Sequence, residues 1–269
     1  MPELPEVETT VRAIKNFEGS DLKKIIIHNP NLRWRVDPNI EKIIRDKFIK
    51  TISRRAKYII ITFDTKYLII HLGMSGKLRI QKAKDNFFKK HDHVEFIFKD
   101  LKIIYNDPRR FGSIHLIDDI NSHFLLSSLG VEPLSRSFNK EYLYSLSKTS
   151  NLNIKKLIMD QKKVVGVGNI YASESLFLAK VKPTKISRSI NLDECAAIVS
   201  SIKKILKYAI KMGGTTLNDF YSADGSEGYF KLKLKVYGRE DEPCKTCSEA
   251  IKKINIGQRA TYYCSKCQS

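Results

Sequence analysis

Residues 57–72, which read KYIIITFDTKYLIIHL, contain two short apolar runs separated by the polar residues Asp64-Thr65-Lys66. Isoleucine and tyrosine dominate both runs. β-Branched and aromatic side chains favour strands, and a short polar break between two such runs is typical of a β-hairpin. The stretch therefore predicts two antiparallel strands, Lys57–Phe63 and Lys66–Leu72, joined by a tight turn.

Similar runs lie on both sides of this hairpin, again separated by short polar breaks such as Lys99-Asp100. Several short strands at such intervals predict a sandwich or barrel of antiparallel strands. The additional predicted strands are Lys23–His28, Lys77–Gln81, His93–Phe98, Leu101–Asn106 and Ser113–Ile117.

From about Ser122 the apolar residues follow a helical period instead. Asn191, with Glu194 three residues later, resembles a capping box, and Gly213-Gly214 provides the stop signal of the long helix that it opens. Cys195 lies on the apolar stripe of this helix, so we expect it to pack in the core. Shorter helices are predicted over Asn139–Ser147, Asn151–Gln161 and Ile170–Lys180, and a strand over Tyr229–Tyr237.

The N-terminus reads Met1-Pro2-Glu3-Leu4-Pro5-Glu6 and suits a helix start, because proline is favoured in the first helical turn. Removal of Met1 would leave Pro2 with a free secondary amine. A terminal amine has a reference pKa of about 8, well below that of lysine, so it is a plausible nucleophile. Glu3 and Glu6 are near enough in sequence to act as acid/base partners. The alternative is an ordinary acidic helix start.

Four of the five cysteines form two pairs, Cys244-x-x-Cys247 and Cys264-x-x-Cys267, with sixteen residues between the pairs. Two CxxC pairs at this spacing predict a four-thiolate zinc site, with disulfides or free thiols as the alternative. Because four protein ligands leave no position for water, the zinc should be structural. Arg259 falls in the intervening segment, where it could meet a phosphate or simply be exposed.

Four further segments allow either a nucleic-acid contact or a structural role. In the first, Gly166-Val167-Gly168-Asn169 precedes a helix, where small residues admit a phosphate and where Asn169 could equally be the N-cap. Residues 54–57 are a basic cluster placed at a strand start, either binding DNA or forming a solvated edge. Loops 71–76 and 107–112 carry Met74, Arg109 and Phe111, side chains suited to wedging into a base stack or to anchoring the loops in the core.

The composition favours a polyanionic partner. Lys and Arg total 48 against 29 Asp and Glu, a formal net charge of +19. Nucleic acid fits this excess first and an anionic membrane surface second. No apolar run approaches the ~20 residues of a membrane span and no signal peptide is evident, so we expect a soluble, intracellular protein.

Taken together, these segments resemble the bacterial formamidopyrimidine-DNA glycosylases over essentially the whole chain. The resemblance implies an α+β protein of two lobes: an antiparallel β-sandwich with an N-terminal helix, and a helix–two-turn–helix domain with a four-cysteine zinc-finger β-hairpin. It implies domains at residues 1–121, 122–230 and 231–269, with a lesion-covering loop at 215–229. It also implies one structural Zn²⁺, a monomer, a cytoplasmic, nucleoid-associated location and damaged double-stranded DNA as partner.

The resemblance further implies removal of oxidised purines in base-excision repair, followed by β,δ-elimination at the resulting abasic (AP) site. Pro2 would form the Schiff base with the sugar, with Glu3 as acid/base group and Glu6 as its neighbour. Phosphates would be held by Lys57, His71, Asn169 and Arg259, while Met74, Arg109 and Phe111 would fill the space of the flipped nucleotide. Glu174 is a lesser candidate for the interior of the site.

Three other functions compete with this one. An endonuclease VIII-like glycosylase for oxidised pyrimidines would have glycine in place of Leu4 and would lack the Arg109 and Phe111 pair. A non-catalytic zinc DNA-binding protein fits the charge and the cysteines but has no use for Pro2. A structural RNA-binding protein does not explain the acidic N-terminus.

Overall fold

The computed structural model describes residues 2–214 and 234–269. The predicted covering loop 215–229 lies outside these residues, as does the first part of the strand predicted over 229–237. The described chain forms two compact units, one of residues 2–127 with 212–214 and the other of residues 128–211 with 234–269.

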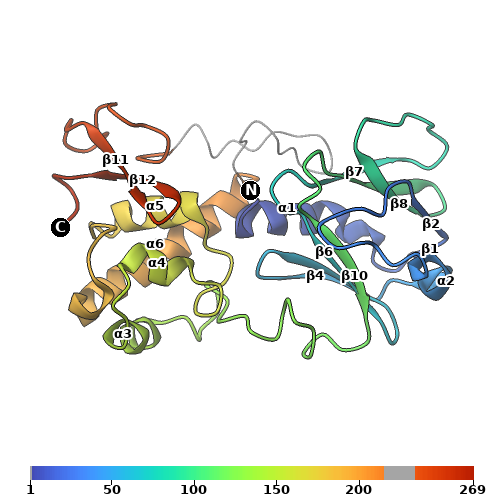
Figure 1. Ribbon diagram of the computed structural model, residues 1–269, viewed down its shortest axis with the longest axis horizontal. Helices are drawn as coiled ribbons and strands as arrows, with labels where there is room; N and C mark the ends of the chain where they lie inside the picture. The colour runs from blue at the N-terminus through green and yellow to red at the C-terminus, as the bar shows by residue number, and fades with distance from the viewer. Residues whose placement is uncertain (1, 215–233) are drawn as a thin grey trace. The chain divides into compact units, whose positions relative to one another are not determined.

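The first unit contains two antiparallel four-stranded sheets among its described residues (Figure 1). The strand order is β10-β6-β5-β4 in one sheet and β2-β8-β9-β7 in the other. The sandwich prediction is therefore confirmed and the barrel alternative is wrong. The strands are β2 (Lys24–Ile27), β4 (Thr51–Arg55), β5 (Tyr58–Thr62), β6 (Tyr67–His71), β7 (Lys77–Lys82), β8 (Asp92–Ile97), β9 (Leu101–Asn106) and β10 (Ser113–Ile117), beside a small pair of β1 (Asp21–Leu22) and β3 (Lys47–Phe48).

The alternation of side chains along the strands produces the core between the sheets. Ile59 and Ile61 of β5 enter the same apolar cluster as Val94 and Phe96 of β8. Residues two apart on a strand point to the same face, so each strand contributes every second side chain. Ile60, between the two β5 core residues, is also buried, at 3% exposure.

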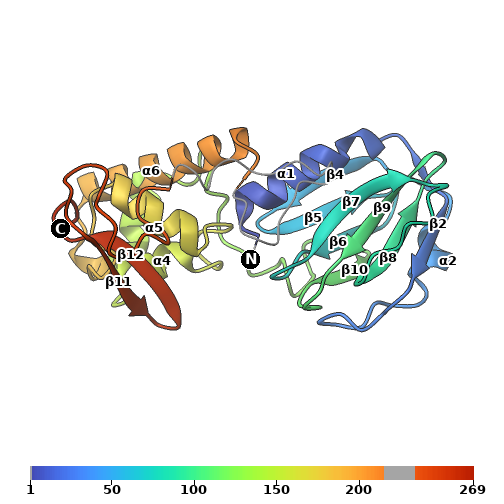
Figure 2. The ribbon, with the colours of Figure 1, turned by 90° about the horizontal axis from the view of Figure 1, so that it is seen from above.

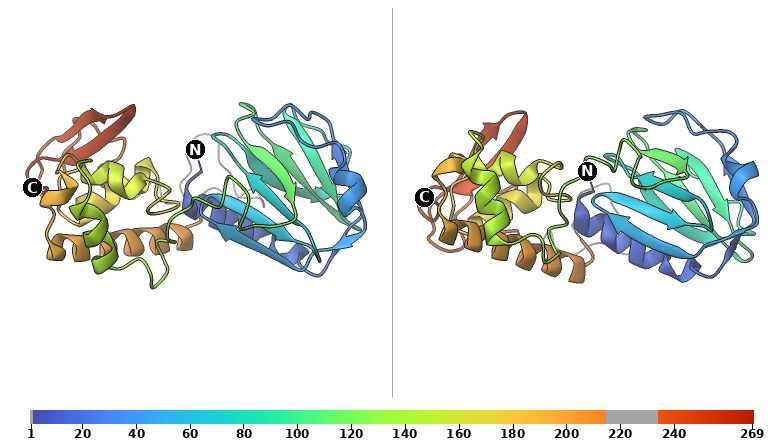
Figure 3. Two further views of the ribbon diagram at one scale, coloured as in Figure 1. Left: turned by 60° about the horizontal axis from the view of Figure 1, so that its bottom comes forward. Right: turned by 90° about the horizontal axis from the view of Figure 1, so that it is seen from below.

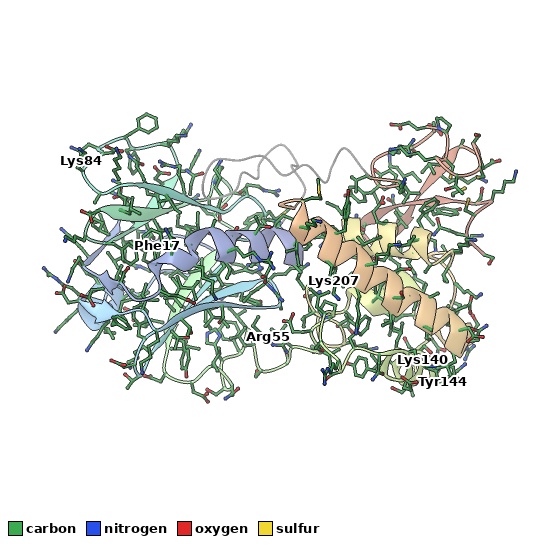
Figure 4. All side chains as sticks on the ribbon, turned by 180° about the vertical axis from the view of Figure 1, so that it is seen from behind. Phe17, Arg55, Lys84, Lys140, Tyr144 and Lys207 are labelled. Atoms are coloured by element: carbon green, nitrogen blue, oxygen red, sulfur yellow. The ribbon has the colours of Figure 1, made fainter. Side chains whose placement is uncertain are left out.

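Helix α1 (Leu4–Ile14) lies along β4 and β5 (Figure 2). Its buried residues Val7, Val11 and Ile14 belong to the core cluster of the sandwich. A short 3₁₀ turn, η1 (Lys15–Phe17), follows directly. Phe17, labelled in Figure 4, closes this end of the core with its ring centroid 4.5 Å from that of Phe98. The start of α1, which Pro2 and Glu3 directly precede, is thus fixed to the sheet by the rest of the helix.

The second unit combines helices with one β-hairpin (Figure 3). Helix α6 contacts α3 and α5, and α5 contacts both α4 and the hairpin strand β12. In the hairpin, Ile251 pairs with Cys264 and Ile256 with Arg259. The elements are α3 (Lys140–Lys148), α4 (Ile154–Met159), α5 (Asn169–Leu178), η2 (Ser187–Ser189), α6 (Leu192–Lys211), β11 (Ile251–Ile256) and β12 (Arg259–Cys264).

Most predicted elements are present, with a few exceptions. The polar strand β4 was not predicted, because Ile52 is its only apolar residue. The short elements β1, β3 and α2 (Ile40–Ile44) were also missed. Helix α4 is shorter than the predicted Asn151–Gln161. No strand forms over residues 234–237, the described part of the strand predicted there.

The predicted helix signals are confirmed for α6. Glu194 N–H donates to Asn191 Oδ1 at 2.8 Å, and Asn191 N–H donates to Glu194 Oε2 at 3.0 Å, which forms the capping box. Gly213 and Gly214 follow the helix with φ of +77° and +83°. Cys195 is fully buried on the apolar stripe, as predicted. None of the helices in residues 2–214 and 234–269 has the length and apolar character needed to cross a membrane.

Candidate active site and nucleic-acid interface

Pro2, Glu3 and Glu6 are buried together at the start of α1. Glu3 is the N-cap, and Glu3 and Glu6 form a reciprocal capping box in which Glu3 N–H donates to Glu6 Oε2 at 2.9 Å. Pro5 in the first turn suits this geometry because its missing N–H would be unpaired there in any case. The positive end of the helix dipole favours both carboxylates. The two acids are therefore held at a defined position next to Pro2.

Gly214 lies against Glu6. A Cβ added to Gly214 would lie 3.0 Å from Glu6 Oε1 and 3.4 Å from Glu6 Cα, and the φ of Gly214 is +83°. Both the close contact and the left-handed backbone favour glycine at this position. Gly214, one of the two glycines predicted as a helix stop, thus also brings the backbone against Glu6.

Lys57 is presented by the turn between β4 and β5. The basic cluster at residues 54–57 spans this turn, so the prediction that it begins a strand is wrong for its first two residues, which end β4. Arg54 Nε donates to Glu8 Oε2 at 3.0 Å, and an Arg54 terminal nitrogen donates to the carbonyl of Ala56 at 2.8 Å. Ala56 has a φ of +53°, a conformation that alanine rarely adopts. Arg54 therefore joins α1 to the turn that carries Lys57.

His71 ends β6, paired with Tyr58, and the two ring centroids are 4.9 Å apart. Burial, and then the positive charges of Lys57 and Arg33, lower the pKa of His71 from 6.5 to about 4. Gly73 N–H lies 3.3 Å from His71 Nδ1, so Nδ1 accepts and the neutral ring carries its proton on Nε2. His71 can thus donate a hydrogen bond to an anion without first being charged.

The loops that carry Met74, Arg109 and Phe111 touch each other. A Cβ added to Gly73 would lie 2.4 Å from Gly112 N, so the two backbones are in direct contact. Phe111 is 45% exposed, and the Arg109 guanidinium lies 4.9 Å from its ring centroid. The alternative in which Phe111 anchors its loop in the core is therefore wrong. Met74 is half-buried.

Asn169 is the first residue of α5 rather than its N-cap, which is Gly168. The alternative in which Asn169 is the N-cap is therefore wrong, and the side chain makes longer-range contacts instead. Asn169 Nδ2 donates to the carbonyl of Ala260 at 2.9 Å, and Asn169 Oδ1 accepts from Lys155 Nζ at 2.6 Å. Ala260 is in β12 beside the exposed residue Arg259. The structure thus brings Asn169 and the strand of Arg259 together within the second unit.

Lys155 is the main residue of this cluster that the sequence analysis missed. It is 1% exposed, and its Nζ also donates to Thr261 Oγ1 at 2.7 Å. In the sequence, only its position on the helix indicates that Lys155 is buried. Lys155 lies on the same helix face as the apolar residue Ile158, three residues on, whereas its neighbour Lys156 is exposed.

Glu174, the lesser candidate for the interior of the site, is buried in the second unit. Its carboxylate accepts the backbone N–H groups of Lys235, Val236 and Tyr237 at 2.8–2.9 Å. These bonds explain why residues 234–237 form a loop around Glu174 instead of a strand. Glu174 is therefore a buried structural acceptor in the second unit.

The four cysteines of the C-terminal pairs converge. Their sulfur atoms all lie within 4.8 Å of one another, with Cys244 Sγ 3.9 Å from Cys267 Sγ and Cys247 Sγ 3.4 Å from Cys264 Sγ. A tetrahedral site with Zn–S bonds of about 2.3 Å requires sulfur separations of roughly 3.8 Å. The donor set fits one Zn²⁺ held by four thiolates, which would fix the base of the β11–β12 hairpin.

Three family descriptions match successive parts of the chain. The formamidopyrimidine-DNA glycosylase N-terminal domain matches residues 1–114, the formamidopyrimidine-DNA glycosylase H2TH domain residues 129–221, and the zinc finger found in FPG and IleRS residues 241–269.

Relatives and solved structures match the whole chain. Formamidopyrimidine-DNA glycosylase of Hydrogenovibrio crunogenus is 48% identical over 100% of this chain and 96% of its own, and that of Pasteurella multocida is 46% identical over 100% and 99%. Two complexes of Lactococcus lactis Fpg, a mutant with Fapy-dG DNA and the protein with abasic-site DNA, are 36% identical with TM-scores of 0.92 and 0.91. They cover 100% and 99% of both chains, respectively. This chain therefore belongs to the formamidopyrimidine-DNA glycosylase family.

Proposed function

We propose that this protein is a base-excision repair enzyme, a bifunctional DNA glycosylase and AP lyase that removes oxidised purines from duplex DNA. The observation that carries the proposal is the burial of Pro2, Glu3 and Glu6 together at the start of α1, in a chain that matches formamidopyrimidine-DNA glycosylases over its full length. A binding protein without catalytic activity would not need this arrangement.

In the proposed reaction, the Pro2 amine forms a bond to C1′ of the damaged nucleotide. The bond between C1′ and the base breaks, and its electron pair leaves with the base, which takes up a proton. Opening of the sugar ring gives an iminium between Pro2 and C1′. Covalent amine catalysis of this kind divides one difficult step into easier ones.

The iminium is cationic at every pH, so it acidifies the C2′ hydrogen. Loss of that proton expels the 3′ phosphate, and a second elimination expels the 5′ phosphate. Glu3 would move protons at the sugar, because it is the carboxylate next to Pro2 in the chain. Glu6 accepts the Glu3 N–H and would keep Glu3 in position.

The DNA backbone would be held by groups from both units. Lys57 and the neutral Nε2–H donor of His71 come from the first unit, and Asn169 and Arg259 from the second. The zinc site would support the last contact, because Arg259 and the ligand Cys264 are the two ends of β12. Met74, Arg109 and Phe111 would occupy the space of the flipped nucleotide, for which an exposed arginine on an aromatic ring is suited.

The preference for oxidised purines is supported by Leu4 and by the Arg109 and Phe111 pair. Lactococcus lactis Fpg has been solved with Fapy-dG DNA and also with DNA containing an oxidised pyrimidine, so a relative accommodates both classes. An endonuclease VIII-like preference is the alternative. We further propose that the protein acts as a monomer in the bacterial cytoplasm, associated with the nucleoid.

The test is excision from duplexes that carry 8-oxoguanine opposite cytosine or an oxidised pyrimidine opposite adenine, with an undamaged duplex as control. The proposal predicts faster excision of 8-oxoguanine and a one-nucleotide gap with phosphate at both ends. Faster excision of the pyrimidine would favour the alternative. Binding to these duplexes without any cleavage would instead support a non-catalytic zinc DNA-binding protein.

A further inference from the structure

Asp107 is a buried acceptor at the base of the two loops that carry Met74, Arg109 and Phe111. Its side chain is 0% exposed. Oδ1 accepts from Ser75 Oγ at 2.6 Å, and Oδ2 accepts from Gly112 N–H at 2.9 Å with the Tyr105 hydroxyl 3.2 Å away. One carboxylate thus joins the loop after β6 to both ends of the loop after β9.

Ser75 extends this connection to Arg109. Its hydroxyl donates to Asp107 and accepts the Arg109 backbone N–H at 3.1 Å. The Asp107 main chain takes part as well, because its carbonyl accepts from Arg110 N–H at 3.2 Å and lies 2.8 Å from His93 Nε2. Every step from the carboxylate to the Arg109 backbone is therefore a direct hydrogen bond.

These bonds matter because the tips of the loops are exposed while their bases are buried. Arg109 and Phe111 protrude, and the close approach of Gly73 to Gly112 leaves no room for a side chain between the loops. Inserting side chains into a base stack costs a few kcal/mol of unstacking, so a wedge must be rigid to do this efficiently. If the loop were disordered before insertion, the free-energy cost of ordering it would be added to the cost of unstacking.

We propose that Asp107 and Ser75 are positioning residues for base extrusion: they hold Met74, Arg109 and Phe111 as one rigid wedge and so determine how fast a paired lesion leaves the stack. The inference rests on the proposed function, because it presumes that these three side chains enter the duplex. The proposed role concerns base extrusion alone, because neither Asp107 nor Ser75 contributes a reacting group to the chemistry at Pro2.

The test compares Ser75→Ala with Ser113→Ala. Both substitutions remove a buried serine hydroxyl, but Ser113 Oγ has no hydrogen-bond partner among the described residues, so it is a matched control. Single-turnover rates are measured on 8-oxoguanine paired with cytosine, which must be unpaired and unstacked, and on an abasic site, which has no base to extrude. Asp107→Asn is a second variant, in which the side chain keeps its size but one of the two carboxylate oxygens that accept hydrogen bonds is replaced by an NH₂ group.

Ser75→Ala should slow excision of 8-oxoguanine roughly tenfold, the loss expected when a buried hydrogen bond is broken, and should change abasic-site cleavage less than about twofold. Asp107→Asn should act in the same direction, and Ser113→Ala should change neither rate. Equal losses on both substrates, or no loss on either, would overturn the positioning role. An unsubstituted enzyme that does not excise 8-oxoguanine would instead overturn the proposed function, and the inference with it.

Discussion

Lys155 Nζ donates a hydrogen bond of 2.6 Å to Asn169 Oδ1, and the same buried ammonium reaches Thr261 Oγ1 at 2.7 Å. These two bonds connect α4, the first residue of α5 and strand β12. Asn169 and Arg259, the two proposed phosphate ligands of the second unit, therefore depend on one lysine that need not touch DNA.

Replacing Lys155 by methionine should weaken binding of lesion DNA about tenfold, because Asn169 and the β12 strand lose a shared donor and Asn169 Oδ1 is left unpaired. Affinity measured at fixed salt tests this. Lys207→Met is the control, since Lys207 is an exposed cation on α6 (Figure 4) and its loss removes the same charge. Equal weakening by both substitutions would show that charge alone is responsible.

Glu8 offers an internal comparison between two ion pairs. It accepts from Arg54, whose side chain is 10% exposed, and from Arg12, which is 60% exposed, each at 3.0 Å. Double-mutant cycles with Met substitutions of each arginine and Glu8→Gln should give a coupling of about 1–3 kcal/mol for Glu8 with Arg54. For Glu8 with Arg12 the coupling should be below about 1 kcal/mol. Unfolding in urea measures both values, and a larger coupling for Arg12 would be inconsistent with the joining role of Arg54.

The pKa of His71, about 4, makes stability depend on pH. Between about pH 6.5 and pH 4 the unfolded chain binds a proton on this ring that the folded chain does not. The contribution of His71 to the free energy of unfolding is therefore complete above pH 6.5, and it is lost as the pH falls from 6.5 towards 4. His71→Gln should reduce the difference in unfolding free energy between pH 7 and pH 5. An NMR titration in which the His71 ring has a pKa near 6.5 would refute this.

Removal of zinc should unfold the hairpin end of the second unit. The hairpin strands share a small buried cluster with Cys244 and Cys264, too few apolar residues to hold two strands alone. Cys264→Ser should reduce bound zinc, measured by elemental analysis, well below one ion per chain and should weaken DNA binding. Cys195→Ser is the control, since Cys195 lies outside the cluster. Full zinc content in Cys264→Ser would argue against the four-thiolate site.

The sequence was sufficient to predict most of the sandwich strands, because continuous runs of β-branched and aromatic residues such as Lys57–Phe63 mark buried strands directly. It was also sufficient for the cysteine site, since ligand spacing is a local property. It could not show that Lys155 is buried or that Glu174 binds the 235–237 backbone, because both contacts join segments far apart in the chain. Strand β4 was missed for a different reason: its exposed face is polar, so it lacks an apolar run.

The capping alternative for Asn169 shows the same limit. An asparagine after glycine at a helix start has the local pattern of an N-cap. In the structure the helix begins at Asn169 itself, and the Asn169 side chain forms hydrogen bonds with Lys155 of α4 and Ala260 of β12. Local rules placed the start of the helix within one residue but could not identify the partners of Asn169.

Borohydride trapping tests whether the Pro2 amine is the nucleophile. Protein whose intact mass shows loss of Met1 is incubated with 8-oxoguanine duplex and borohydride, and the covalent complex is digested and mapped by mass spectrometry. If Pro2 is the nucleophile, mass spectrometry will find a reduced DNA adduct on the N-terminal peptide, at Pro2. Absence of an adduct from processed protein, or an adduct on a lysine such as Lys57, would contradict it.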